Sequence, residues 1–351
     1  MVLLEEHLLL IFKYGRIDYI YVDPHGQGSL RRIFKDNMKI LVIGDTGFVA
    51  GYLFPYLADR FPECSLYGMA RHDPEDPNVA VEHLRGDITS TNEVVEVVKG
   101  ILPDIIINLS SISSVSESWA APVACHQINY FGVLNLCLAI IEHVPNTKLV
   151  QISSLEVYGG NEDPSVCYSE SSPLDPRSPY AVSKAGSEFI VQQYGASHGL
   201  HYTILRPSNH TGPRRKPLYV LSGFAKQLAE IKQGLRQPVL SVGNLNVHKD
   251  FMDVRDVVRA YGLVLTSDRA NQQILNVCSG GSYPISWLLD YMINAAGVNV
   301  EIRIDPGRFR PADANYIRGS NSKIKDVTGW RPEIPIETTL QELVVFWENA
   351  I

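Results

Sequence analysis

The feature that most constrains this fold is a regular alternation of short β-branched runs with segments of helical length, which begins at Met38. Most of the expected strands are continuous apolar runs, which is typical of strands covered by helices on both faces. We expect strands at 39–43, 65–70, 81–86, 104–109, 147–152, 201–206 and 273–278, and helices at 50–60, 91–100, 123–144 and 179–198. The alternation therefore predicts an α/β fold with a doubly wound parallel sheet.

The expected elements divide most of the chain into two parts. Residues 38–205, with about 247–280, carry the evenly spaced strands and are predicted to form a nucleotide-binding domain. Residues 206–246 and 281–351 add no evenly spaced strands and contain the Pro, Gly and Arg residues of a looped region. We expect these two segments to form a smaller C-terminal lobe that binds the substrate.

The first 37 residues differ in character from the rest of the chain. Their apolar run is interrupted by Glu5, Glu6 and His7, whereas a secretory signal needs positive charge in this region. Met38 directly precedes the first expected strand. We therefore interpret residues 1–37 as an extension of doubtful role, either dispensable or a consequence of start-site choice.

Composition argues against several classes of function. The 351 residues include 31 basic and 38 acidic side chains, and the net charge of −7 argues against a general nucleic-acid binder. No stretch approaches roughly 18 uninterrupted apolar residues, so no membrane span is expected. Five scattered cysteines without C-x-x-C spacing suit a reducing, cytoplasmic location, and ten histidines without ligand spacing predict no metal site.

A glycine-rich turn follows the first expected strand and opens the first expected helix. Gly44-Asp-Thr-Gly47-Phe-Val-Ala50 has the spacing G-x-x-G-x-x-A. Glycine lets the backbone approach a diphosphate, and the unpaired N–H groups of the following helix N-terminus complement its charge. The turn therefore predicts a Rossmann domain with a dinucleotide site whose first ligands are Gly44, Thr46, Gly47, Phe48 and Val49.

The end of the second expected strand bears on the choice of cofactor. Arg71 stands where an NAD-binding domain usually has an acidic residue for the ribose hydroxyls, and Arg suits a 2′-phosphate. Asp73 blurs this assignment, so NADP(H) is predicted and NAD(H) is the alternative. Asp87 and Ile88 are placed to contact the adenine, although Asp87 is equally suited to cap the helix at 91–100. The predicted cofactor site is completed, after the fourth strand, by Leu109, Ser110 and Ser111.

Tyr180 and Lys184 lie four residues apart and therefore share one face of an expected helix. The helix follows a strand that ends in a polar cluster containing Ser154, which is where open α/β sheets place their chemistry. Reducing a ketone by hydride needs a proton donor at the carbonyl oxygen, and a cation that lowers the pKa of a phenol improves that donor. We predict Tyr180 as this donor, Lys184 as the cation that also binds the nicotinamide ribose, and Ser154 as a second donor. The alternative is an ordinary surface Tyr and Lys on an amphipathic helix.

The glycine turn, Ser154, Tyr180 and Lys184 together resemble the extended short-chain dehydrogenase/reductase superfamily. Within it, the chain is similar to the GDP-mannose 4,6-dehydratase branch, and most of all to GDP-4-dehydro-6-deoxy-D-mannose reductases. The similarity covers 38–351 and is carried by Ile204-Leu-Arg206-Pro-Ser-Asn209-His210-Thr-Gly-Pro213-Arg214-Arg215, Val242-Gly-Asn244-Leu, Asp250-Phe-Met-Asp253-Val-Arg255-Asp256 and Arg308-Phe-Arg310-Pro311-Ala-Asp313. It implies NADPH-dependent reduction of a GDP-linked 4-keto-6-deoxy sugar to GDP-D-rhamnose or GDP-6-deoxy-D-talose, by a homodimer.

The resemblance also implies roles for individual residues. It makes Ser154, Tyr180 and Lys184 catalytic, and it places His210 and Arg215 near the cofactor. The substrate-binding residues that it implies are Ser154, Asn209, Arg214, Asn244, Lys249, Arg255 and Arg310. A guanidinium offers paired donors for a diphosphate, which favours Arg310 in particular. For each arginine, a structural or surface salt bridge is the alternative.

Three positions depart from the family pattern. Ala50 replaces the usual third glycine, and Lys249 stands where the family commonly has Arg, which makes contact with a diphosphate less directional. Glu156 occupies the position of the carboxylate base of the dehydratases, and it is kept as a candidate catalytic residue. Similar reductases also carry Glu there, so this residue does not decide the reaction.

Two enzymatic alternatives and one non-enzymatic alternative stay open. Dehydratases of this branch typically have Gln-Asp-Gly where this chain has Phe48-Val-Ala50, and they lack the Arg-Pro-Ala-Asp sequence of 310–313, which favours a reductase. The alternatives are a GDP-mannose 4,6-dehydratase and another nucleotide-sugar epimerase or dehydratase. A non-enzymatic dinucleotide-binding protein is less favoured, because such proteins usually lose the Tyr/Lys pair. The sequence does not indicate which face of C4 receives the hydride.

Overall fold

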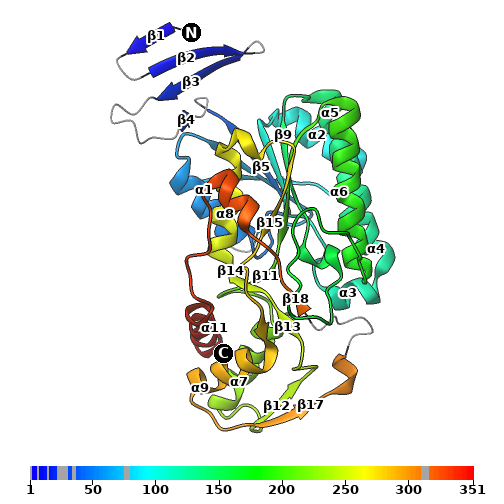
Figure 1. The fold of residues 1–351 in the computed structure, drawn as a ribbon, viewed down its shortest axis with the longest axis vertical. Helices are drawn as coiled ribbons and strands as arrows, with labels where there is room; N and C mark the ends of the chain where they lie inside the picture. The colour runs from blue at the N-terminus through cyan, green and yellow to red at the C-terminus, as the bar shows by residue number, and fades with distance from the viewer. Residues whose placement is uncertain are drawn as a thin grey trace.

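One large parallel sheet organises the molecule (Figure 1). The computed structural model describes residues 2–5, 8–13, 16–21, 31–33, 37–74, 80–309 and 316–351. The seven strands of this sheet within those residues are β5 (Lys39–Ile43), β6 (Ser65–Ala70), β7 (Val81–Arg85), β8 (Ile105–Asn108), β9 (Lys148–Ile152), β10 (His201–Pro207) and β15 (Gln273–Val277). Their spatial order is β15-β10-β9-β8-β5-β6-β7, and every pairing is parallel. The predicted doubly wound sheet is confirmed, and each expected strand ends within one residue of the observed one.

Helices cover both faces of the sheet, which explains why its strands are apolar throughout. On β5, Ile40 and Val42 enter the core under α1 (Ala50–Arg60) and α8 (Val254–Thr266). Leu41 and Ile43 point to the opposite face, as successive strand residues must. That face is covered by α2 (Thr91–Ile101), α5 (Gly132–His143) and α6 (Pro179–His198). The sheet is therefore buried on both sides, and its chemistry is confined to the strand ends.

The helix expected at 123–144 consists of three consecutive pieces. They are α4 (Pro122–His126), a π-helical turn η1 (Gln127–Phe131) and α5. By length and apolar composition alone, the segment Pro122–His143 is sufficient to cross a membrane. The prediction of no membrane span did not anticipate this, because it rests only on uninterrupted runs of apolar residues. In the fold, α5 packs against α2 and α6, and about half of its residues are buried. A core helix passes the same length and composition test.

A second lobe continues from β10 through β11 (Asn209–Thr211) and lies below the sheet in Figure 1. Its core is formed by side chains such as Leu228, Leu289 and Leu343. Its main elements are α7 (Val220–Lys232), β12 (Val239–Val242), α9 (Ile285–Ala296), β17 (Glu301–Ile304) and α11 (Ile336–Ala350). Shorter strands there and at the junction with the sheet are β13 (His248–Lys249), β14 (Phe251–Asp253), β16 (Tyr283–Pro284) and β18 (Tyr316–Ile317). The short helix α3 (Val115–Ala120) follows β8 and packs against α4 and α6.

One part of 281–351 does not belong to the core of the second lobe. Helix α10 (Ser322–Thr328) contributes Ile324 to the core under the large sheet, and Trp330 is fully buried in the same core. The indole N–H of Trp330 donates to the carbonyl of Asp256, at 2.9 Å. The predicted division at residue 281 does not anticipate this return of the chain to the sheet.

The N-terminal segment forms a sheet of its own. Strands β1 (Val2–Glu5), β2 (Leu8–Lys13), β3 (Arg16–Tyr21) and β4 (Arg31–Ile33) pair in this order, and all three pairings are antiparallel. Within the described residues these strands pair only with one another. That residues 1–37 are dispensable stays a prediction.

Candidate active site

The predicted glycine turn joins β5 to α1 and approaches the end of β8. Gly44 has a φ of +84°, and a Cβ there would lie 2.8 Å from the backbone nitrogen of Ser110. Glycine is therefore required on both conformational and steric grounds. Helix α1 begins at Ala50 without a capping side chain and without an acidic residue in its first turn. The N–H group of Gly51 already donates to Gly47, so the N–H groups of Phe48, Val49 and Ala50, which have no partner among the described residues, are the ones available to a dinucleotide diphosphate.

The predicted 2′-phosphate contact lies at the end of β6. Arg71 directly follows this strand and is exposed. Asp73, which blurs the assignment from sequence, is bound by Arg85, whose Nε donates to its carboxylate at 2.9 Å. This ion pair lowers the pKa of Asp73, so the carboxylate is charged and directed at Arg85. The arrangement is compatible with the prediction of NADP(H).

The loop after β7 decides one of the open alternatives. Ser90 caps α2, because its side chain accepts a hydrogen bond from the N–H of Glu93. The alternative role of Asp87 as the helix cap is therefore wrong. Asp87 instead accepts hydrogen bonds from the N–H and the hydroxyl of Thr89, each at 2.9 Å. Ile88 is buried against α5, and adenine contact by either residue stays a prediction.

Ser154, Tyr180 and Lys184 are brought together at the carboxyl end of β9. Tyr180 lies in the first turn of α6, just after the capping residue Ser178, and Ser154 caps the short helix η2 (Leu155–Tyr158). The ammonium of Lys184 donates to the carbonyl of Ile152 at 2.8 Å and lies 6.0 Å from the ring centre of Tyr180. Tyr180 is 8% exposed and Lys184 is 2% exposed, so the alternative of a surface Tyr and Lys is wrong.

Burial dominates the titration of these groups. It raises the pKa of Tyr180 well above its ordinary value, although a hydrogen bond with Ser154 and the charge of Arg215 act in the opposite direction. Burial also lowers the pKa of Lys184 to about 8. The prediction that a neighbouring lysine brings the phenol below its ordinary pKa is therefore wrong for this structure. The cost of desolvating a phenolate exceeds the gain from the cations around it.

The carboxylate of Glu156 faces the ammonium of Lys249 across the site, at 3.4 Å. Glu156 lies on η2 and Lys249 on β13, so the pair joins the sheet side of the site to the second lobe. Both side chains are largely, but not fully, buried. Two of the predicted site residues, one catalytic and one substrate-binding, are thus direct neighbours.

Arg215 and His210 come from the segment after β10. The Cζ atom of Arg215 lies 4.7 Å from the ring centre of Phe48 in the glycine turn and 3.4 Å from that of Tyr219. His210 donates from Nδ1 to the carbonyl of Ser208 at 2.9 Å. Burial and the charge of Arg215 lower the pKa of His210 to about 4, so the imidazole is neutral near pH 7.

The other predicted substrate ligands are less uniformly placed. Arg214 adopts a φ of +71° and brings its guanidinium beside Gly51 in the first turn of α1. Asn209 lies on β11, and the side chain of Asn244 accepts a hydrogen bond from the N–H of Asn246 at 3.0 Å. Arg310 lies outside the described residues, and its role stays a prediction.

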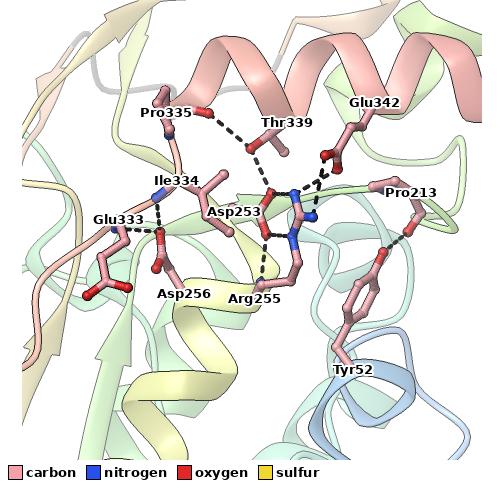
Figure 2. Close-up of polar contacts among 10 residues, drawn as sticks. All are labelled: Tyr52, Pro213, Asp253, Arg255, Asp256, Glu333, Ile334, Pro335, Thr339 and Glu342. Carbon is pink, nitrogen blue, oxygen red and sulfur yellow. Dashed lines mark hydrogen bonds and ion pairs between the residues drawn. The ribbon is translucent and has the colours of Figure 1, made fainter. Parts of the chain in front are cut away.

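Arg255 has two carboxylate partners at the junction of the lobe with α8 (Figure 2). Its Nε and Nη2 donate to Asp253 at 2.8 Å, and Nη2 also donates to Glu342 of α11 at 2.7 Å. Asp253 caps α8 and accepts a further hydrogen bond from the hydroxyl of Thr339. This geometry corresponds to the structural alternative for Arg255 rather than to a substrate ligand.

Sequence reasoning missed several polar residues of the site. Tyr219 contacts Arg215, and its hydroxyl is 2.7 Å from the hydroxyl of Ser113. In η1, Asn129 donates to the hydroxyl of Ser183 at 3.0 Å and accepts from the N–H of Ile112 at 2.9 Å. Tyr219 and Arg215 are four residues apart, whereas the hydrogen-bonded partners lie 17 to 106 residues apart in the chain, and no local spacing connects them.

A further missed pair lies beneath the glycine turn. The carboxylate of Asp45 is 2.7 Å from Nδ1 of His83 on β7, and Gly68 on β6 leaves the space for it. Among the described residues no group of three or more His, Cys, Asp or Glu side chains could hold a metal ion, and all five cysteines are free.

Comparisons with known proteins agree with this geometry. A family model described as GDP-mannose 4,6 dehydratase matches residues 41–343. The GDP-6-deoxy-D-mannose reductase of Pseudomonas aeruginosa is 35% identical over 314 residues, 89% of this chain and 98% of that protein. The GDP-mannose 4,6-dehydratase of Yersinia enterocolitica is 28% identical, over 87% of this chain and 92% of that protein.

Solved structures of nucleotide-sugar enzymes share the fold of this chain. The structure of RMD from Pseudomonas aeruginosa complexed with NADPH superposes with a TM-score of 0.76 at 32% identity, over 90% of this chain and 100% of that one. A UDP-glucose 4-epimerase from Thermus thermophilus, in complex with NAD, superposes with a TM-score of 0.80 at 28% identity, with the same coverage. The shared fold therefore extends over most of this chain.

Proposed function

Because this chain belongs to the GDP-mannose 4,6-dehydratase family of extended short-chain dehydrogenases/reductases, we propose that it reduces the 4-keto group of GDP-4-dehydro-6-deoxy-D-mannose. The reductant is NADPH, with NADH as the alternative, and the product is GDP-D-rhamnose or GDP-6-deoxy-D-talose. The observation that carries the proposal is the buried group of Ser154, Tyr180 and Lys184 in a chain 35% identical to a GDP-6-deoxy-D-mannose reductase.

The residues around the glycine turn fit a dinucleotide. A Cβ at Gly44 would close the space beside Ser110, and the N–H groups of the turn that leads into α1 are offered to the diphosphate. In this proposal Arg71 binds the 2′-phosphate and Lys184 binds the nicotinamide ribose. When bound, reduced nicotinamide supplies the hydride.

The protein side of the reaction is proton donation and charge stabilisation. The hydroxyl of Tyr180 donates its proton to the sugar O4 while hydride adds to C4, so the carbonyl becomes an alcohol. Ser154 donates a hydrogen bond to the same oxygen and stabilises the negative charge that develops there. The raised pKa of Tyr180 keeps the phenol protonated at neutral pH, as a proton donor requires.

The cofactor balance tests this function directly. Purified protein is incubated with GDP-4-dehydro-6-deoxy-D-mannose and NADPH, and nicotinamide oxidation is followed beside NMR of the sugar. We expect one NADPH to be consumed per sugar reduced, and the NMR spectrum identifies the configuration at C4. Conversion of GDP-mannose to a 4-keto sugar with catalytic NADP would instead show a dehydratase, for which Glu156 occupies the position of the base.

The exposed face of α4, η1, α5 and α6 supports a homodimer. Large apolar side chains are exposed there: Val123, Phe131, Leu138, Val182 and Phe189. Figure 1 shows these helices along one side of the molecule. Apolar patches of this kind mark protein interfaces, and a second copy of the same face would cover them. Sedimentation of wild type and Phe189→Glu tests this, because a wild-type monomer would contradict the proposal.

We also place the protein in the cytoplasm. All five cysteines are free thiols, three of them buried, which suits a reducing compartment. Fractionation of cells that express the full chain, with detection of a C-terminal tag, tests the location. Recovery in the membrane or secreted fraction would contradict it.

A further inference from the structure

Arg215 is a half-buried cation of the site, and its guanidinium contacts aromatic rings. Its guanidinium carbon lies 3.4 Å from the ring centre of Tyr219 and 4.7 Å from that of Phe48. Its Nε atom is buried and has no hydrogen-bond partner among the residues that the structure describes. The buried Arg206 of β10, in contrast, is paired with a carboxylate, because its Nε donates to Glu188 at 2.9 Å. Arg215 therefore keeps a charge that no carboxylate in the described part of the site neutralises.

The two rings hold Arg215 from opposite parts of the molecule. Phe48 belongs to the glycine turn, whereas Tyr219 directly precedes α7 of the second lobe. The hydroxyl of Tyr219 is in turn fixed by a 2.7 Å hydrogen bond with Ser113, beyond the end of β8. Three segments far apart in the sequence thus determine where one guanidinium lies. Cation–π contacts with desolvated rings are strong enough to hold such a group in place.

The charge of Arg215 acts on the proton donor of the reaction. Tyr180 is influenced by Glu156 from η2, by Lys184 from its own helix, and by Arg215 and Tyr219 from the segment after β11. Tyr261 of α8 also interacts with it. Arg215 is the cation among the groups that most affect the pKa of Tyr180, and its positive charge favours the phenolate. The ammonium of Lys184 is directed at the carbonyl of Ile152 instead.

We propose that Arg215, held between Phe48 and Tyr219, is a positioning residue whose charge helps Tyr180 to give up its proton during reduction of the sugar. The inference rests on the proposed function. In the step, hydride from reduced nicotinamide forms the new C4–H bond, and the carbonyl π electrons form an O4–H bond with the phenolic proton. Tyr180 is left as a phenolate, and Arg215 stabilises that negative charge.

A mutant series measures this role apart from cofactor binding. The variants are Arg215→Met, Arg215→Lys, and Lys216→Gln as a control that removes an exposed neighbouring charge. Each is tested for NADPH affinity by fluorescence and for single-turnover reduction of the keto sugar, in wild-type and Tyr180→Phe backgrounds. Because the loss of one charge that stabilises the phenolate changes proton transfer by about an order of magnitude, we expect Arg215→Met to slow the reduction roughly tenfold.

Three further results are expected if Arg215 acts through Tyr180. Affinity for NADPH changes less than the rate, Arg215→Lys restores most of the rate, and Arg215→Met has little effect in the Tyr180→Phe background. Lys216→Gln behaves like wild type. Tyr219→Ala reproduces most of the effect of Arg215→Met, while Tyr219→Phe, which keeps the ring, has a smaller effect.

Other outcomes overturn the inference. If Arg215→Met weakens NADPH binding and leaves the single-turnover rate unchanged, Arg215 is a cofactor ligand only. If its effect is as large in the Tyr180→Phe background, it does not act through Tyr180. If wild type binds NADPH and does not reduce the keto sugar, the proposed function fails instead. Should Arg215→Met not fold, Arg215→Lys and Tyr219→Ala decide by the same measurements.

Discussion

Two clusters of charged side chains in this molecule differ in what surrounds their cations. At the junction of the second lobe with α8, Arg255 is bound by the carboxylates of Asp253 and Glu342 (Figure 2). In the candidate active site, Lys184 is bound by a backbone carbonyl and Arg215 by two aromatic rings. The pKa of Arg255 is accordingly raised by its partners, whereas burial lowers the pKa values of Lys184 and Arg215.

The difference in partners distinguishes cations that stabilise the fold from cations that act in the active site. A cation paired with carboxylates stabilises the fold, and its charge has little effect beyond the pair. A cation desolvated without such partners costs stability, and its field acts on neighbouring groups and ligands. The contrast between the junction and the active site can therefore be tested by separating effects on stability from effects on rate.

The largest effect is expected at the proton donor. Tyr180→Phe removes the hydroxyl and keeps the ring, so the reduction loses its general acid and slows by about 10²- to 10⁴-fold. Single-turnover oxidation of NADPH with the keto sugar measures the rate, and thermal melting confirms the fold. A loss of less than about threefold would mean that the site does not use this phenol.

The next largest effect is the pH dependence of stability that arises because burial disfavours the charged form of Lys184. Its pKa is about 8 in the folded chain against 10.5 ordinarily, so between these pH values the unfolded chain binds more protons than the folded one. The free energy of unfolding should therefore rise from about pH 8 to about pH 10.5, by up to roughly 3 kcal/mol from this residue. Urea unfolding of wild type and Lys184→Met over this range measures it. An equal pH dependence in both proteins would show that Lys184 does not titrate as described.

At the junction, the stability effect should be large and the rate effect small. Asp253→Asn removes the charge of a fully buried carboxylate that caps α8 and binds Arg255. We expect the free energy of unfolding to fall by about 2–3 kcal/mol, since one buried partner of an ion pair is lost and Arg255 is partly exposed. Asp175→Asn, in the exposed pair with Arg177, is the matched control and should change stability much less. Similar losses of unfolding free energy in the two variants would show that the buried pair at the junction is no more stabilising than an exposed pair.

The smallest effect is expected at Arg255 itself. Because the side chain is 39% exposed, Arg255→Met should cost about 1 kcal/mol of stability and leave the KM for the GDP-sugar within about twofold of wild type. Steady-state kinetics with varied keto sugar gives the KM. A tenfold rise in KM without loss of stability would restore the substrate-binding role that the family resemblance implies.

The sequence predicted the sheet closely, because its strands are continuous apolar runs bounded by glycine, proline and polar residues. It also predicted the grouping of Ser154, Tyr180 and Lys184, since the strand end and the first turn of α6 are local features. It left two roles open for Asp87, and the structure excludes the role of helix cap, because the backbone geometry selects Ser90 to cap α2.

What the sequence could not predict depends on contacts between distant residues. Arg255 is separated by 87 residues from Glu342, and Tyr219 by 106 from Ser113. Whether an arginine finds a carboxylate, a ring or a ligand is decided only when these segments pack. The pKa of Tyr180 likewise could not be predicted from the sequence. The sequence shows that a lysine lies four residues away, but it does not show how strongly burial raises the pKa of the phenol.

The most direct test of the central claim is the fate of the hydride. The protein is incubated with GDP-4-dehydro-6-deoxy-D-mannose and NADPH that carries deuterium at both hydrogen positions of C4 of the nicotinamide, and the sugar is analysed by NMR. We predict one deuterium at C4 of the sugar, in a single configuration, for each NADPH oxidised. Conversion of the sugar without deuterium at C4, or without oxidation of NADPH, would contradict the account.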